Sequence, residues 1–119
     1  MEMIIMLKAA SLLFAAAALG GILMAGLRFN GHPRPPSWLA MGHGLLAAAG
    51  LTLLIYAWCN AGIPAMAQIA TVLFIIAAIG GAAMNLLFHS KQLPLPIPLM
   101  IVHGLLAVSA FVLLLLSVF

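Results

Sequence analysis

The chain has 119 residues, of which 67% are hydrophobic and only 4% are charged, and its mean hydropathy is +1.35. A soluble domain carries about 25% charged residues, so this composition excludes a soluble globular protein and predicts that lipid surrounds most of the chain. The formal net charge of +3 rests on four basic residues that form no dense patch, which argues against nucleic acid as a partner.

Four apolar stretches of about 20 residues follow one another, each long enough to cross roughly 30 Å of hydrocarbon. We expect membrane-spanning helices over residues 4–27, 38–58, 65–88 and 99–119. Ser37 is expected to cap the second helix, and a short turn is expected over 59–64. The proline-rich segments 28–36 and 89–98 cannot be helical throughout, because proline lacks the N–H group and clashes with the preceding turn.

The second half of the sequence repeats the first half at a constant offset of 60 residues. Gly20-Gly21 recurs as Gly80-Gly81, and His43-Gly44-Leu45-Leu46-Ala47 recurs as His103-Gly104-Leu105-Leu106-Ala107. Matching positions recur in steps of three and four, which places them on one face of each helix. The sequence therefore predicts an all-α integral membrane four-helix bundle made of two tandem two-helix repeats. One repeat covers about 4–58 and the other about 65–119, within a single membrane domain over 1–119.

An even number of spans in each repeat inserts both copies in the same direction, so an axis along the membrane normal should relate them. We expect the matching faces to point toward this axis. His43 and His103 lie on these faces, roughly 8–9 Å from the membrane edge at about 1.5 Å of rise per residue. An ionisable residue at such depth is uncommon and usually faces the interior of a bundle.

Two imidazoles that oppose each other across a bundle can supply both axial ligands of a haem iron. We therefore expect a haem b between His43 and His103, with electron transfer rather than stand-alone catalysis as the function. Small residues would leave room for a flat macrocycle, and basic residues at the nearby membrane face would pair with haem propionates. The further candidate cofactor-binding residues are Gly21, Gly81, Gly44, Gly104, Arg28, Arg34 and Lys91.

The histidine pair resembles that of the cytochrome b561-type haem bundles, in which histidines on alternate helices bind b haems and pass electrons across a membrane. The resemblance is architectural and covers His43 and His103 alone. This chain has one histidine pair within its spans, where the eukaryotic family has two. The resemblance implies one haem near one membrane face, which needs a partner such as quinone or another redox subunit.

Three other interpretations stay open. Glycine pairs and buried histidines also serve close helix packing, which favours a non-catalytic accessory subunit of a larger membrane complex, or a homodimer. Met24 and Met84 with the two histidines would make a soft set of two nitrogens and two sulfurs that suits copper. A small-solute transport protein is the third interpretation, although Glu2 is the only acidic residue of the chain.

The basic residues also predict an orientation. Both proline-rich segments carry basic residues, and the middle turn carries none. The positive-inside rule then predicts that both segments lie in the cytoplasm and both termini outside, in a bacterial inner membrane, although Lys8 counts weakly against this orientation. His32, His89 and Cys59 have no assigned role at this stage.

Overall fold

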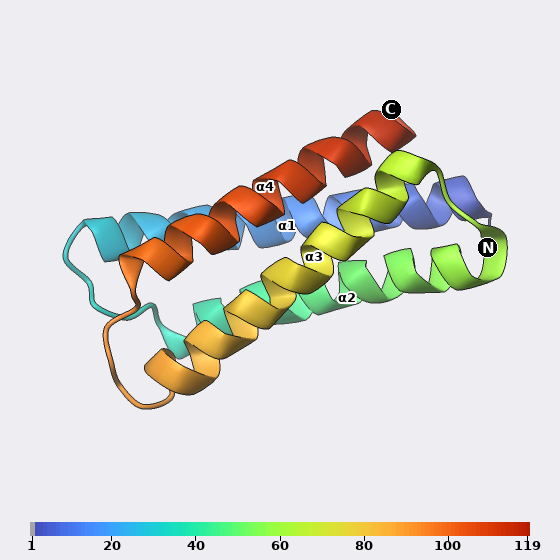
Figure 1. Ribbon diagram of the computed structural model, residues 1–119. Helices are drawn as coiled ribbons and strands as arrows, with labels where there is room; N and C mark the ends of the chain where they lie inside the picture. Colours follow the sequence, from blue (N-terminus) through green and yellow to red (C-terminus); the bar gives the residue numbers. More distant parts are fainter. Residues whose placement is uncertain (1) are drawn as a thin grey trace.

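The computed structural model describes residues 2–119, and these residues form four long helices without any strand (Figure 1). The helices are α1 (Met3–Phe29), α2 (Ser37–Ala61), α3 (Ala65–Met84) and α4 (Ile97–Val118), and one π-helical turn, η1 (Asn85–His89), extends α3. All four are long and apolar enough to cross a membrane when α3 is taken together with η1. The predicted all-α four-helix bundle is confirmed, and its helices fit an integral membrane protein.

The helices form two antiparallel hairpins, α1–α2 and α3–α4. Figure 1 shows both proline-rich loops at one end of the bundle and the two termini with the α2–α3 connection at the other. Contacts are most extensive within each hairpin, and α1 with α4 and α2 with α3 form the less extensive contacts between hairpins. The helices α2 and α4 are therefore diagonally opposite, as are α1 and α3. The bundle is 43 Å long, so its ends extend beyond about 30 Å of hydrocarbon into the headgroup regions.

Prolines determine where α2 and α4 begin. Pro36 occupies the N-cap position of α2, so Ser37 is already helical and its side chain makes no capping hydrogen bond. The predicted Ser37 cap is therefore wrong. Helix α4 begins at Ile97, ahead of the expected residue 99, because Pro98 lies in the first turn, where no backbone N–H group is required.

The end of α2 also lies beyond the expected residue 58. No proline or glycine lies between Trp58 and Gly62, whose φ of +70° ends the helix in a conformation that suits glycine. In the last turn, Asn60 Nδ2 donates a hydrogen bond of 2.9 Å to a backbone oxygen four residues earlier. The connection between the hairpins is consequently shorter than the predicted turn over 59–64.

Repeat-related side chains make matching contacts in the core. Phe14 of α1 and Phe74 of α3 stack across the bundle, with ring centroids 3.7 Å apart and an interplanar angle of 3°. Two buried hydroxyl groups, Ser11 Oγ and Thr71 Oγ1, each donate a 2.8 Å hydrogen bond to a carbonyl oxygen of their own helix. Because no water reaches a lipid-embedded core, these internal acceptors remove the cost of burying the two hydroxyl groups.

Gly50 lies against this aromatic stack, and its substitution tests the packing. A Cβ atom there would lie 2.8 Å from Cε2 of Phe14, whose ring is held by Phe74. We expect Gly50→Ala to lower the free energy of unfolding by about 1–3 kcal/mol, as overpacking of a core does. Thermal unfolding in detergent, followed by circular dichroism, measures this change.

The matched control for that experiment is Gly26→Ala in α1, where an added Cβ would meet nothing within 4 Å. We expect this variant to be as stable as the parent or slightly more stable, because alanine favours a helix over glycine. Equal melting temperatures for Gly50→Ala and Gly26→Ala would contradict the described packing around Phe14.

Candidate functional site

His43 and His103 face each other across the centre of the bundle. They lie on the diagonally opposite helices α2 and α4, and each is about 9 Å along the axis from the first residue of its helix. Their ring centroids are 6.2 Å apart and their planes are inclined by 71°, an edge-to-face arrangement. The structure thus brings together the two histidines that the repeat predicted to share one depth.

A backbone carbonyl of the neighbouring helix holds each imidazole. His43 Nδ1 lies 2.7 Å from the oxygen of Ala17, and His103 Nδ1 lies 2.8 Å from the oxygen of Ala77. A carbonyl oxygen can only accept, so Nδ1–H is the donor in both hydrogen bonds. In the neutral ring, Nε2 then carries a lone pair that can accept a hydrogen bond or bind a metal. A histidine that binds a metal through one nitrogen likewise donates its other ring N–H group to a carbonyl or a carboxylate.

The glycine pairs of α1 and α3 make this contact possible. A Cβ atom on Gly21 would lie 3.1 Å from Cε1 of His43, and a Cβ atom on Gly81 would lie 3.1 Å from Cε1 of His103. A Cβ atom at either position would require the imidazole to shift by a few tenths of an ångström and would thereby alter its hydrogen bond to the carbonyl oxygen. The space beside these glycines is therefore occupied by the histidine rings, a role that the sequence analysis did not assign to them.

The Nε2 atoms of both histidines remain accessible. Within residues 2–119, neither Nε2 atom takes part in a hydrogen bond. Every fully buried side-chain nitrogen or oxygen atom of these residues has a hydrogen-bond partner, so the two Nε2 atoms cannot be fully buried. The same residues contain no cluster of three or more His, Cys, Asp or Glu side chains suited to a metal ion. The chemistry available here is that of a two-imidazole donor set.

The other predicted residues of the helices lie around this pair in different ways. Gly44 and Gly104 directly follow the histidines, but a Cβ atom on either would meet nothing within 4 Å, so neither glycine is needed for helix contact. Met84 is buried, whereas Met24 is only half-buried.

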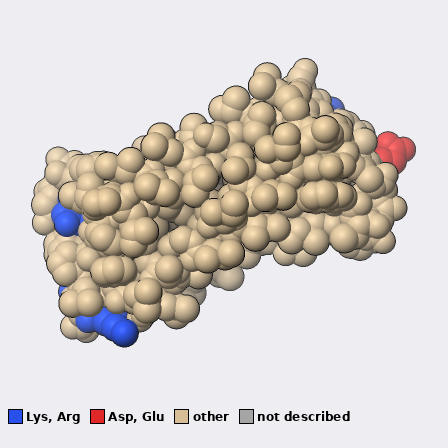
Figure 2. All heavy atoms as spheres, in the orientation of Figure 1, with Lys and Arg blue, Asp and Glu red and all other residues tan. Residues whose placement is uncertain are grey.

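The three predicted basic residues lie at the end of the bundle that carries the proline-rich loops. Figure 2 shows basic atoms at this end, and the acidic atoms together with a smaller patch of basic atoms at the opposite end. Arg28 is half-buried, and its Nε donates a 3.0 Å hydrogen bond to the oxygen of Leu95, which ties the end of α1 to the second proline-rich loop. Arg34 and Lys91 are exposed. The positive charge thus lies beyond the histidine pair, toward the nearer end of the bundle.

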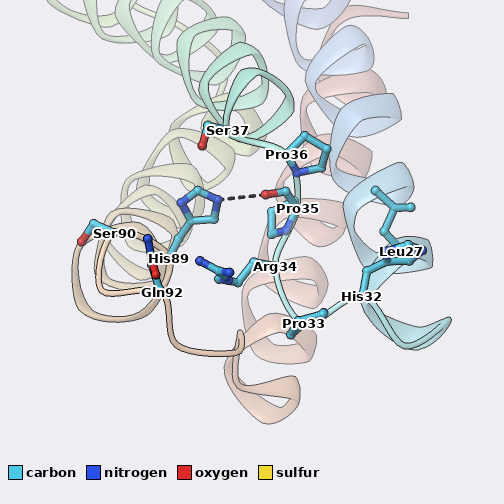
Figure 3. A pocket seen from close by; sticks show the side chains of 10 residues that line it. All are labelled: Leu27, His32, Pro33, Arg34, Pro35, Pro36, Ser37, His89, Ser90 and Gln92. Carbon is cyan, nitrogen blue, oxygen red and sulfur yellow. Dashed lines mark hydrogen bonds between the residues drawn. The ribbon is translucent and has the colours of Figure 1, made fainter.

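A second group of residues, which the sequence analysis left without a role, surrounds a hollow of about 670 Å³ between the two proline-rich loops (Figure 3). His32, Arg34 and His89 line this loop hollow, and His89 Nε2 donates a 2.9 Å hydrogen bond to the oxygen of Pro35. The offset of 60 residues aligns His89 with Phe29 and His32 with Gln92, so the repeat did not reveal that these residues meet.

Comparisons with known proteins give no family for this chain. No family model matches it, and neither a curated protein nor a solved structure is significantly similar to it. Its function is therefore argued from the geometry of its own side chains.

The contact between each glycine and its histidine can be tested without any cofactor. In protein labelled with ¹⁵N at histidine and held in detergent, we expect the neutral rings of His43 and His103 both to carry their proton on Nδ1, because each donates to a carbonyl. We expect Gly21→Ala to alter the ring signals of His43 and to leave those of His103 nearly unchanged. Two-dimensional NMR of the ring nitrogens measures both effects.

The matched control for the NMR experiment is Gly44→Ala, whose added Cβ atom faces open space. We expect its spectrum to retain both Nδ1–H signals. A proton on Nε2 of both rings in the parent protein would contradict the described hydrogen bonds.

Proposed function

We propose that the chain is a b-type cytochrome of the membrane, which transfers electrons through one haem held between His43 and His103. The observation that carries this proposal is that the two imidazoles make equivalent hydrogen bonds and lie at the same depth in the bundle. They belong to separate repeats, each donates Nδ1–H to a carbonyl, and each retains an unbonded Nε2 at one depth of an apolar bundle. Two neighbouring imidazoles with unbonded Nε2 atoms are a donor set that a haem iron can take from a protein.

The donor set fits a haem better than it fits a bare metal ion. A haem would need only His43 and His103 as protein ligands, whereas a structural zinc ion takes about four protein ligands. When bound, a haem supplies reversible one-electron chemistry, which none of the side chains of this bundle provides.

The histidines are held so that a cofactor can enter without breaking their hydrogen bonds. Ala17 and His43 belong to the first hairpin, and Ala77 and His103 belong to the second. A change in the distance between the hairpins therefore leaves both Nδ1 bonds intact. Because the contacts between hairpins are less extensive than those within them, this interface is where space for a macrocycle is made most easily.

Arg28 is the basic residue best placed to pair with a haem carboxylate. It lies about two helical turns beyond Gly21, and hence on the face of α1 that carries the histidine contact. Its Nε is bound to Leu95, and the remaining guanidinium N–H groups can bind a propionate. Lys91 adds positive charge at the same end, and Arg34 lines the loop hollow, so we assign propionate pairing to Arg28 and Lys91 alone.

We further propose that the loop end faces the cytoplasm of a bacterial inner membrane. Three basic residues lie in or beside the two proline-rich loops, whereas Lys8 is the one basic residue near the opposite end. A single haem about 9 Å from the loop end cannot carry electrons across about 30 Å of hydrocarbon by itself. The proposed partner is therefore a quinone or another redox subunit that exchanges electrons from the same side.

An absorption spectrum tests the proposed haem. For the full-length protein purified in detergent from haem-replete bacteria, we expect a Soret band and sharp α and β bands after reduction with dithionite. We expect His43→Ala and His103→Ala each to lose these bands, because each substitution removes one axial ligand. The control is His32→Ala, an exposed loop histidine whose replacement should leave the spectrum unchanged.

A colourless parent protein from the same cells would overturn the haem proposal. Metal analysis then separates the other interpretations: copper that is lost in both histidine variants would favour a copper protein, and the absence of any metal would favour an accessory subunit. The edge-to-face contact of the two rings would in that case serve helix packing alone.

The proposed orientation can be tested with the native thiol of Cys59. This thiol is exposed near the end of α2 that is remote from the proline-rich loops. We expect a membrane-impermeant maleimide to label Cys59 in intact spheroplasts. In the double variant Cys59→Ser, Ser90→Cys, the thiol lies at the loop end, and we expect labelling only after permeabilisation. The reverse pattern would contradict a cytoplasmic loop end.

A further inference from the structure

We propose that the loop hollow binds the phosphate of an anionic phospholipid headgroup. Six polar residues line it, namely His32, Arg34, Ser37, His89, Ser90 and Gln92. In Figure 3, Arg34 extends from the first loop toward His89 and Gln92 of the second loop. The Arg34 guanidinium, the His32 imidazole, the Ser37 hydroxyl and the Gln92 amide can donate hydrogen bonds to phosphate oxygens, whereas His89 Nε2 and Ser90 Oγ already donate to backbone oxygens.

The walls of the hollow are held in place by hydrogen bonds between the loops. Leu95 N–H donates to the oxygen of Pro33 at 3.0 Å, and Arg28 Nε donates to the oxygen of Leu95 at 3.0 Å. The 2.9 Å bond from His89 to Pro35 closes the same side. Because prolines have a fixed φ, this frame loses little freedom when a ligand binds. The hollow therefore exists only where both repeats meet, and neither loop forms it alone.

The electrostatics of the hollow favour an anion. Arg34 carries a permanent positive charge, and the only carboxylate side chain of the chain, Glu2, lies at the opposite end of the bundle. No carboxylate can therefore neutralise Arg34 from within the chain. Helix α2 also begins at Ser37, so its positive dipole end lies at the wall of the hollow and adds to the attraction.

The position of the hollow identifies a lipid as the source of the phosphate. The loops lie at the end of a bundle 43 Å long, which exceeds about 30 Å of hydrocarbon and reaches the level of the headgroups. Trp38 is exposed directly after Ser37, as interfacial tryptophan residues are. A phospholipid beside the bundle would thus place its phosphate at the level of Arg34 while its acyl chains cover the exposed apolar face of the helices.

Native mass spectrometry of the full-length protein with defined lipids tests this proposal. We expect the parent protein to retain phosphatidylglycerol in preference to phosphatidylcholine. We expect Arg34→Gln to weaken this retention by on the order of tenfold, because a charge-assisted hydrogen bond to phosphate is lost. His32→Gln should weaken it less. The matched control is Lys8→Gln near the opposite end, which should retain the lipid as the parent does.

Two outcomes would overturn the proposal. Equal retention of phosphatidylglycerol by the parent and Arg34→Gln, with both proteins folded by circular dichroism, would show that the hollow does not hold the lipid. Displacement of the lipid by inorganic phosphate at low millimolar concentration would identify free phosphate as the ligand instead. Neither outcome bears on the proposed haem, because Arg34 is not among its proposed partners.

Discussion

Two hydrogen bonds, from His43 to Ala17 and from His103 to Ala77, link the packing of each hairpin to its chemistry. An N–H group without an acceptor costs several kcal/mol in a lipid-embedded core, so each imidazole must lie directly on the backbone of the neighbouring helix. That approach favours glycine at the contact, because a Cβ atom there would crowd the ring. The hydrogen bond also determines which ring nitrogen carries the proton. The distance between the helices at the level of the histidines and the lone pair on Nε2 therefore depend on the same hydrogen bond. A change at Gly21 or Gly81 would alter both.

The bundle is nearly symmetric at its centre and asymmetric at its loop end. The Phe14–Phe74 stack joins one diagonal pair of helices, and the histidine pair joins the other, so the axis of the repeat passes through both contacts. At the loops the two copies differ, and none of the six polar residues that line the hollow recurs as the same residue type at the matching position of the other copy. A duplicated hairpin can thus provide two equivalent ligands for one symmetric cofactor, while its diverged loops provide a single asymmetric site.

The number of helices was predictable from the four apolar stretches of the sequence. The proximity of the two histidines was predictable because the repeat places them at the same depth on matching helix faces. Residue preferences at helix ends predicted less well. Ser37 was expected to be the N-cap residue of α2, but Pro36 occupies that position. The role of the glycine pairs was missed because it depends on the distance between two helices, which periodicity does not contain. The loop hollow was missed for a related reason, since it depends on hydrogen bonds such as Leu95 to Pro33 between segments far apart in the sequence.

The depth of the histidine pair connects the two proposed sites. Both histidines lie in the half of the bundle next to the loops, about 9 Å from the start of their helices, and the basic residues lie beyond them at the same end. An anionic lipid in the loop hollow would bring negative charge to the membrane face through which a proposed redox partner approaches. Arg28, whose Nε is bound to the oxygen of Leu95, is a proposed partner of the haem and does not line the loop hollow, so the two proposed sites share no residue. Because the remaining length of the bundle is apolar and lacks a second histidine pair within the described residues, electron exchange at the proposed haem is confined to this end.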